Sequence, residues 1–346
     1  MDHKELGNTG IHIPPIIFGT SALGNLYVAL TENTKSDIIR ECIRYVKKPV
    51  VFDCAGKYGA GLALEMLGKC LQKLHLQPDD VIISNKLGWM RTPLITPGPT
   101  FEKDVWKNLN HDVIQMISYE GIIKCWEQGN ELLGGIFKPQ MVSVHDPDEY
   151  VNQAKNDKER DRLFEDILGA YHALSDLKKQ WKIKAIGIGA KNWRIIEKLS
   201  QYIDFDWVMF ANSMTLFRHP KELTVFMSDL HNKGIAIINS AVFNAGFLVG
   251  GNYFDYQLVD RNHAENIPIF RWRESFFRLC EEYSITPSHA CIRFGISHPA
   301  VTAVALNTSN PKHVRRNVEE VQNDVPVEFY RAMKKMGLIE VDYPFV

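Results

Sequence analysis

Eight short runs rich in valine and isoleucine recur along the chain, with room for a helix between most of them. The runs are almost continuously apolar, which is typical of parallel strands covered on both faces. Helical patterns lie between them, as in residues 163–182, where apolar residues recur at steps of three and four. Strand followed by helix, eight times over, predicts an α/β fold, a closed (β/α)8 TIM barrel rather than an open sheet. The expected strands are residues 15–20, 49–55, 80–89, 140–146, 183–189, 205–212, 234–241 and 300–307.

Three further segments complete the expected architecture. Residues 4–14 contain an Asn-Thr-Gly turn between β-prone pieces, which predicts a short hairpin closing the N-terminal end of the barrel. The connections after Trp89 and after Gly250 are too long to be simple turns, and loops of such length are usually functional. Because both follow strands, we expect them at the C-terminal rim, where barrel active sites are built. The whole chain, residues 1–346, is expected to form this single barrel domain.

Composition excludes several classes of function. The net charge of −1 leaves no electrostatic footprint for nucleic acid. The six cysteines show neither CxxC pairing nor metal-ligand spacing, which indicates reduced thiols in a cytoplasmic protein without a metal site. The N-terminus lacks the apolar region of a signal peptide, and no apolar run is long enough to span a membrane. We therefore expect a cytoplasmic protein that acts on a small molecule, without a nucleic-acid or membrane partner.

Four chemically active residues fall at or just after the ends of successive expected strands. Asp53 and Tyr58 follow the second strand, Lys86 ends the third and His145 ends the fourth. A carboxylate at the end of a buried strand is costly unless it is paired, and Lys86 is the expected partner of Asp53. An ammonium held against Tyr58 would stabilise the phenolate and lower its pKa from the usual value of about 10. A tuned tyrosine beside an imidazole is suited to moving a proton on or off an oxygen, as carbonyl and alcohol chemistry requires.

These residues carry a resemblance to the aldo-keto reductase superfamily. The segment "FDCAGKYG" is similar to the family's Asp-x-Ala-x-x-Tyr-Gly motif, "SNKLG" to its lysine strand and "VSVHDPD" to its histidine strand. Two further segments, "ISYEGIIKCWEQGNELLG" and "FNAGFLVGG", resemble the branch of sugar (D-threo-aldose or L-fucose type) and pyridoxal dehydrogenases. The resemblance implies that Tyr58 is the general acid/base, that Lys86 tunes it, that Asp53 holds Lys86 and that His145 orients the carbonyl. It also implies a nicotinamide cofactor and no metal.

The resemblance further implies where the cofactor and substrate bind. Tyr27 and Trp89 are candidates for the substrate pocket. The sequence departs from the family where a Ser-Asn pair and a Gln hold the nicotinamide amide, since Gly189, Ala190 and Ala211 stand there. The backbone, or the side chains of Asn212 or Ser213, would have to replace them, and Phe243 would supply a stacking ring. The cofactor-binding residues implied are Gly19, Thr20, Asp53, Ser240, Ala241, Val242, Asn307, Ser309, His313 and Asn317.

The resemblance also bears on the choice between NAD and NADP. Members that prefer NADP place a lysine and an arginine at the positions that Asn307 and His313 occupy here, counted back from Asn317. An amide and a neutral imidazole bind a phosphate dianion poorly, whereas arginine pairs with it bidentately. We therefore expect NAD to be preferred, with NADP possible if Arg315 or Arg316 supplies the missing charge.

Three functions remain open on the sequence. The first is a nicotinamide-dependent dehydrogenase that resembles aldose 1-dehydrogenases in oxidising a sugar. The second is an NADPH-dependent reductase of small aldehydes and ketones. The third, from another class, is a cofactor-binding regulatory subunit resembling the β subunits of potassium channels. The sequence fixes neither the particular substrate, nor the physiological direction, nor the oligomeric state.

Overall fold

Eight parallel strands form a closed barrel, as the sequence predicted. The computed structural model describes residues 1–346, and the barrel order is β10-β11-β14-β3-β4-β5-β8-β9, with β9 pairing β10 to close the ring. Each strand lies within one of the eight predicted runs, apart from a single residue at the end of β9. The strands are β3 (Ile16–Gly19), β4 (Val50–Ala55), β5 (Val81–Leu87), β8 (Met141–His145), β9 (Ala185–Ala190), β10 (Trp207–Ala211), β11 (Ala236–Ser240) and β14 (Val301–Leu306).

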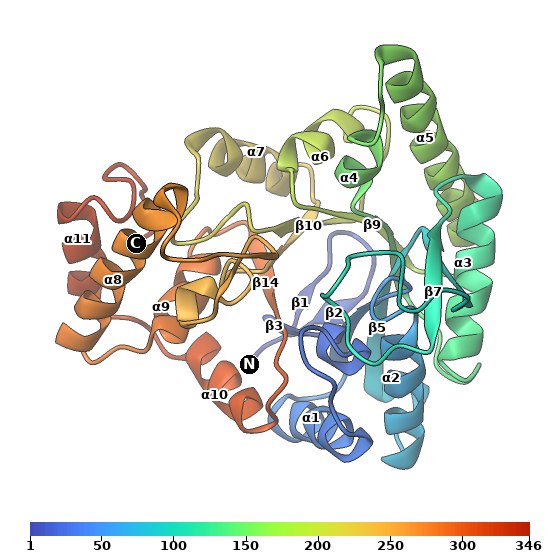
Figure 1. The fold of residues 1–346 in the computed structure, drawn as a ribbon, viewed down its shortest axis with the longest axis horizontal. Helices are drawn as coiled ribbons and strands as arrows, with labels where there is room; N and C mark the ends of the chain where they lie inside the picture. Colours follow the sequence, from blue (N-terminus) through green and yellow to red (C-terminus); the bar gives the residue numbers. More distant parts are fainter.

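Helices surround the strands on the outside of the barrel (Figure 1). The predicted apolar stripe of the longest helix, α5 (Asp157–Lys179), is buried throughout, from Leu163 to Leu177. No helix is long and apolar enough to cross a membrane, and the six cysteines are buried and free. The other helices are α1 (Glu32–Tyr45), α2 (Leu62–Lys73), α3 (Tyr119–Leu132), α4 (Pro147–Val151), α6 (Trp193–Leu199), α7 (Lys221–Asn232), α8 (Ile267–Glu282), α9 (Pro287–Gly295), α10 (Lys312–Gln322) and α11 (Val327–Lys335).

The predicted N-terminal hairpin pairs β1 (Lys4–Glu5) with β2 (His12–Ile13). Its side chains Leu6, Ile11 and Ile13 are buried in the same apolar cluster as the first inward-facing residues of the strands, such as Val51 and Ile82. The hairpin therefore closes the end of the barrel at which the strands begin. The opposite end, where the strands finish, is left for the long loops.

Both long connections carry a hairpin of their own, β6 (Trp89–Pro93) with β7 (His111–Gln115) and β12 (Tyr253–Phe254) with β13 (Gln257–Leu258). The third predicted strand, residues 80–89, is longer than the observed strand β5. It ends at Leu87 because Gly88, with a φ of 110°, turns the chain so that Trp89 begins β6. Short 3-10 turns occur at Ser21–Gly24, Pro78–Asp80, Phe247–Val249 and Ala264–Asn266.

The barrel interior is packed tightly around Trp207, which gives a prediction about stability. A Cβ added to Gly187 on β9 would lie 2.2 Å from ring carbons of Trp207. Gly187→Ala should therefore lower the free energy of unfolding by about 1–3 kcal/mol, the usual cost of overpacking a core. Gly169→Ala is the matched control, since its Cβ meets nothing closer than 3.7 Å and alanine in a helix interior gains about 0.5–1 kcal/mol over glycine. Urea denaturation midpoints measure both, and an unchanged midpoint for Gly187→Ala would contradict the tight packing.

Candidate active site

Alternation along the strands aims three of the predicted residues into the barrel. Side chains two apart on a strand share a face, and Val51, Ile82 and Met141 all belong to the interior cluster. Asp53 lies two residues beyond Val51 on β4, while Lys86 and His145 lie four residues beyond Ile82 on β5 and Met141 on β8. The three side chains therefore converge at the end of the barrel where the strands finish.

Lys86 lies between Asp53 and Tyr58. Its Nζ donates to Oδ2 of Asp53 and to Oη of Tyr58, the latter at 3.1 Å. The other oxygen of Asp53 accepts a hydrogen bond from the hydroxyl of Ser84 at 3.0 Å. The predicted pairing between Lys86 and Asp53 is therefore present, and it gives the buried ammonium and the buried carboxylate each an opposite charge.

Tyr58 stands on the turn that follows β4, where the chain packs closely against the turn at Gly24. A Cβ on Gly59 would lie 2.2 Å from the carbonyl oxygen of Gly24, and Gly59 has a φ of 60°. Only glycine meets both conditions without strain. The Tyr-Gly pair in the sequence thus has a local cause, because the glycine allows the approach that aims the phenol at Lys86.

Burial opposes the tuning of Tyr58 that the sequence suggested. Burial raises the pKa of Tyr58 to about 12, although Lys86 pulls it downward. For Lys86, burial disfavours the charge, but Asp53 and Tyr58 together hold its pKa above the ordinary value. Lys86 thus remains an ammonium and offsets part of the cost of a phenolate at Tyr58, without bringing its pKa below the reference of about 10.

His145 lies edge-on to the ring of Tyr58, with 5.6 Å between ring centroids. Burial, and then the charges of Lys57 and Lys86, hold the pKa of His145 well below its usual value, so the imidazole is neutral near pH 7. Its Nε2 is 3.5 Å from Oδ2 of Asp146, and its buried Nδ1 has no hydrogen-bond partner. A neutral imidazole at this point can share a hydrogen bond with the oxygen that Tyr58 contacts.

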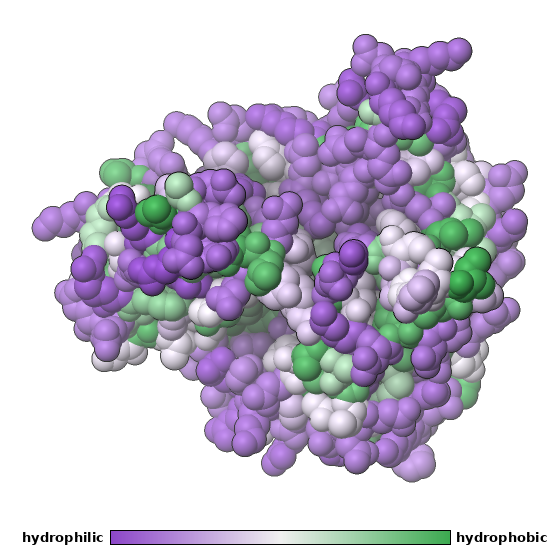
Figure 2. Space-filling view, viewed as in Figure 1, coloured by the Kyte–Doolittle hydropathy of each residue, from purple (hydrophilic) through white to green (hydrophobic).

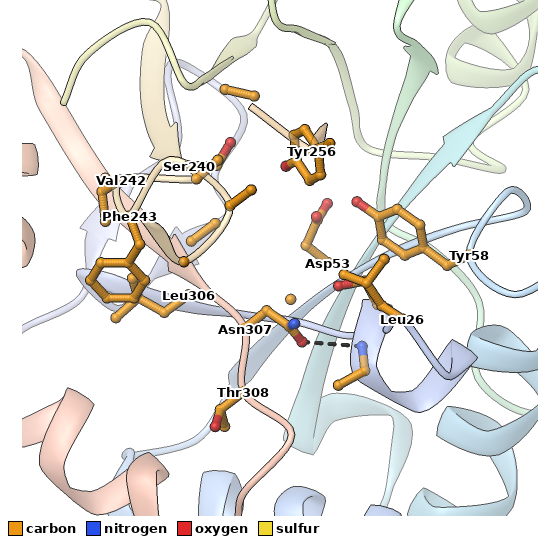
Figure 3. A pocket seen from close by; sticks show the side chains of 18 of the residues that line it. Leu26, Asp53, Tyr58, Ser240, Val242, Phe243, Tyr256, Leu306, Asn307 and Thr308 are labelled. Carbon is orange, nitrogen blue, oxygen red and sulfur yellow. Dashed lines mark hydrogen bonds between the residues drawn. The ribbon is translucent and has the colours of Figure 1, made fainter. Parts of the chain in front are cut away.

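A cavity of about 590 Å³ extends from these four residues across the mouth of the barrel. It opens as a hollow on the face shown in Figure 2. Figure 3 shows Asp53 and Tyr58 on one side of it, Ser240, Val242 and Phe243 on the other, and Asn307 and Thr308 at the lower end. Part of the room comes from small inward-facing residues on the remaining strands, namely Gly19, Gly189, Ala211, Ser240 and Ala305.

All but one of the residues that the sequence assigned to the cofactor line this cavity: Gly19, Asp53, Ser240, Ala241, Val242, Asn307, Ser309, His313 and Asn317. Thr20 lies behind it, where its N–H and its hydroxyl both donate to the carbonyl oxygen of Asp53 at 3.0 Å. Of the two substrate candidates, Tyr27 lines the cavity and Trp89 does not. Trp89 instead packs near Phe101, with the Lys57 ammonium 5.2 Å from its ring.

The chemistry of the cavity fits a dinucleotide. The backbone N–H groups of Ala241, Val242 and Phe243 have no acceptor within the protein, so they can donate to a diphosphate. Phe243 also lines the cavity, as a ring that stacks on nicotinamide would. Ser213 is already committed to the carbonyl oxygen of Lys191, at 2.6 Å, whereas the buried amide of Asn212 has no partner.

At the end of the cavity formed by Asn307 and His313, few groups are free to bind the 2′-phosphate of NADP. Oδ1 of Asn307 accepts from the N–H of Ala22 at 3.3 Å, the dashed line in Figure 3. Burial and the charge of Arg316 lower the pKa of His313. Arg315 points away to Glu319, at 2.7 Å, so Arg316 is the one arginine that lines the cavity, and it lies 3.8 Å from Glu320.

Sequence reasoning missed a group of charged residues beside Asp53, Tyr58, Lys86 and His145. We call Lys57, Glu102, Asp146, Glu149 and Lys191 the charged wall. Nζ of Lys57 lies 2.6 Å from Glu102, 3.3 Å from Glu149 and 3.9 Å from Asp146, and Lys191 bonds the other oxygen of Glu149. Two aromatic residues from the long loops, Trp106 and Tyr256, were also missed. The length of those loops was the only signal for them.

Comparison with known proteins agrees with this geometry. The sequence matches the model of the Aldo/keto reductase family over residues 15–337. It is 26% identical to a pyridoxal 4-dehydrogenase of Microbacterium luteolum, covering 98% of both chains, and 25% identical to a D-threo-aldose 1-dehydrogenase of a Pseudomonas species, covering 95% of this chain and 96% of the other. A glycerol dehydrogenase from Gluconobacter oxydans superposes with a TM-score of 0.69 at 16% identity, covering 100% and 99%. An aldo-keto reductase from Bacillus halodurans gives 0.68 at 17%, covering 98% and 97%. At these identities the solved structures bear on the fold alone.

Proposed function

The chain belongs to the aldo/keto reductase family, whose members are NAD(P)-dependent oxidoreductases acting on CH–OH or C=O groups, and from that premise we propose that it oxidises a sugar at its anomeric carbon, with NAD preferred. The observation that carries the chemistry is the single Lys86 ammonium in contact with both Asp53 and the hydroxyl of Tyr58. The curated relatives named for an aldose and for pyridoxal support a polar aldehyde or lactol as the substrate.

In the proposed reaction, a nicotinamide cofactor held beside Ser240, Val242 and Phe243 would supply the acceptor for the hydride of the substrate carbon. Tyr58, as phenolate, takes the proton from the substrate hydroxyl, and Lys86 stabilises that phenolate. Asp53 keeps Lys86 charged and in place. His145, neutral and beside Tyr58, holds the substrate oxygen by a hydrogen bond. In the reverse direction Tyr58 returns the proton to the carbonyl oxygen as general acid.

Two alternatives are separated by one set of assays. An NADPH-dependent reductase of simple aldehydes and ketones uses the same four residues, and a regulatory subunit would bind cofactor without turnover. A panel of sugars, alcohols and aldehydes, assayed with both cofactors at the nicotinamide absorbance band, distinguishes the three. Efficient NADPH-linked reduction without sugar oxidation would favour the first alternative. Cofactor binding with no turnover across the panel, together with co-purification of a membrane complex, would favour the second.

Tyr58→Phe should abolish turnover and leave cofactor binding nearly intact. The phenylalanine keeps the ring but removes the only group placed to exchange the proton, and general acid/base catalysis contributes about 10²–10⁴-fold. Steady-state kcat and cofactor Kd from fluorescence titration measure the two effects. Tyr202→Phe is the control, because Tyr202 is an exposed tyrosine outside the cavity, and this variant should keep more than a tenth of the wild-type rate. The same residual rate in Tyr58→Phe would refute its assignment.

Lys86→Met should move the pH profile of oxidation. Tyr58 must lose its proton to act as base, so the rate rises with pH toward its pKa, which is about 12 without ligand. Removing the ammonium disfavours the phenolate, raises that pKa further and shifts the rising limb to higher pH. Asp53→Asn should shift the limb less, because the charge of Lys86 remains. Profiles of log kcat against pH that coincide with wild type in both variants would show that Lys86 does not tune Tyr58.

The ratio of kcat/KM for NAD to that for NADP should exceed one, although the family usually uses NADP. Asn307 and a neutral His313 give a 2′-phosphate little charge to pair with, while the amide suits a free 2′-hydroxyl. Asn307→Lys combined with His313→Arg should narrow or invert the ratio. Arg315→Met is the control, because Arg315 pairs with Glu319 outside the cavity. A wild-type preference of tenfold or more for NADP would contradict the proposal and identify Arg316 as the phosphate ligand.

A further inference from the structure

The charged wall faces the substrate end of the cavity. Lys57, Glu102, Asp146 and Lys191 line it together with His145 and Tyr58. The wall is assembled from four separate segments: the turn after β4, the loop between β6 and β7, the segment that runs from β8 into α4, and the turn after β9. It therefore exists only in the folded barrel. Four of its five members line the cavity, and Glu149, outside the lining, bonds both lysines.

We propose that the charged wall recognises the hydroxyl groups of the substrate and selects uncharged polyhydroxylated molecules over their phosphorylated or carboxylated counterparts. This inference rests on the proposed function, and it assigns specificity to residues that take no part in the proton transfer.

The donors and acceptors of the wall suit hydroxyl groups. An ammonium has three N–H donors and a carboxylate has about four acceptor positions on its two oxygens. Lys57 has two carboxylates within 3.3 Å, Glu102 and Glu149, so one of its donors is left for a substrate hydroxyl, and the carboxylates keep unused acceptor positions. A hydroxyl both donates and accepts, and can therefore bridge an ammonium and a carboxylate side by side. Lys57, whose side chain is only 5% exposed, offers both partners together, because Glu102 and Asp146 lie within 3.9 Å of its Nζ.

Aromatic side chains provide the complementary apolar surface. Trp106 lines the same part of the cavity, and its Nε1 donates to Oε2 of Glu102 at 2.6 Å, which fixes both residues. Nζ of Lys191 lies over the ring of Tyr256, 4.7 Å from the ring centroid. Tyr256 faces the cavity and lies above Asp53 in Figure 3. Polar groups and aromatic rings side by side match a molecule that carries both hydroxyl groups and C–H surface.

The balance of charge argues against an anionic substrate. The wall holds two lysines and three carboxylates, so its net charge is −1. Both ammonium groups already have carboxylate partners. A phosphate or carboxylate on the substrate would have to displace Glu102 or Glu149, leaving a half-buried carboxylate without its ammonium partner and adding a further negative charge beside Asp146.

The test compares the oxidation of three probes with NAD: a hexose, the matching hexose 6-phosphate, and benzyl alcohol. In the wild type, kcat/KM for the hexose should exceed that for its phosphate by about tenfold or more. In Lys57→Met, kcat/KM for the hexose should fall at least about tenfold further than for benzyl alcohol, chiefly through KM, as expected for a lost hydrogen bond to a charged group. Lys69→Met, an exposed lysine paired with Glu65, is the matched control and should keep the wild-type ratios.

If Lys57→Met lowered kcat/KM equally for the hexose and for benzyl alcohol and also shifted the pH profile, the inference would be overturned. That result would show that Lys57 acts through His145. Should Lys57→Met fail to fold, Glu102→Gln gives the same test, because it removes one negative charge and should narrow the gap between hexose and hexose phosphate. An unchanged gap in Glu102→Gln also overturns the inference. If benzyl alcohol is oxidised but kcat/KM for the hexose phosphate equals or exceeds that for the hexose, the inference alone is overturned. If none of the three probes is oxidised, the proposed function is overturned with it.

Discussion

The ammonium of Lys86 is buried between a carboxylate and a phenol, and the arrangement of the site follows from the need to satisfy that charge. Asp53 is its counter-ion. The hydroxyl of Ser84, and the N–H and hydroxyl of Thr20 on the carbonyl oxygen of Asp53, hold Asp53 in place. A buried pair of this kind contributes little net stability, but breaking it leaves an uncompensated charge that is strongly destabilising. The pair is therefore better understood as a device that keeps a positive charge beside Tyr58.

The barrel divides its inward-facing positions between two tasks. Near the ends of β4, β5 and β8 the inward positions carry polar side chains, Asp53, Lys86 and His145. On β3, β9, β10, β11 and β14 they carry small ones, such as Gly189 and Ala211. In the proposed function the first group supplies the chemistry, and the second leaves the space for a cofactor. Gly189 and Ala211, which stand where the family has amide-binding side chains, belong to this second group, whereas the partnerless Asn212 does not line the cavity.

The long loops add the surface that a bare barrel lacks. Glu102 and Trp106 come from the connection between β6 and β7, and Tyr256 comes from the connection before α8. Tyr253 stacks on Tyr27 with 4.0 Å between ring centroids, and Arg218 pairs with Asp255 at 3.1 Å. These contacts hold the second loop against the barrel mouth, so that loops and barrel together form one cavity.

The sequence by itself determined the eight strands, the hairpin and the four central residues. Its periodicity carries that information, because alternation along a strand fixes which side chains face inward. Asp53, Lys86 and His145 each lie at the end of such a strand or within two residues of it. The tertiary structure alone decided the charged wall, the roles of Trp106 and Tyr256, the displacement of Thr20 and Trp89 from the cavity lining, and the pKa of Tyr58. These depend on the paths of irregular loops and on the depth of burial, neither of which has a periodic signal. Five charges drawn from four separate segments become neighbours only when the barrel closes.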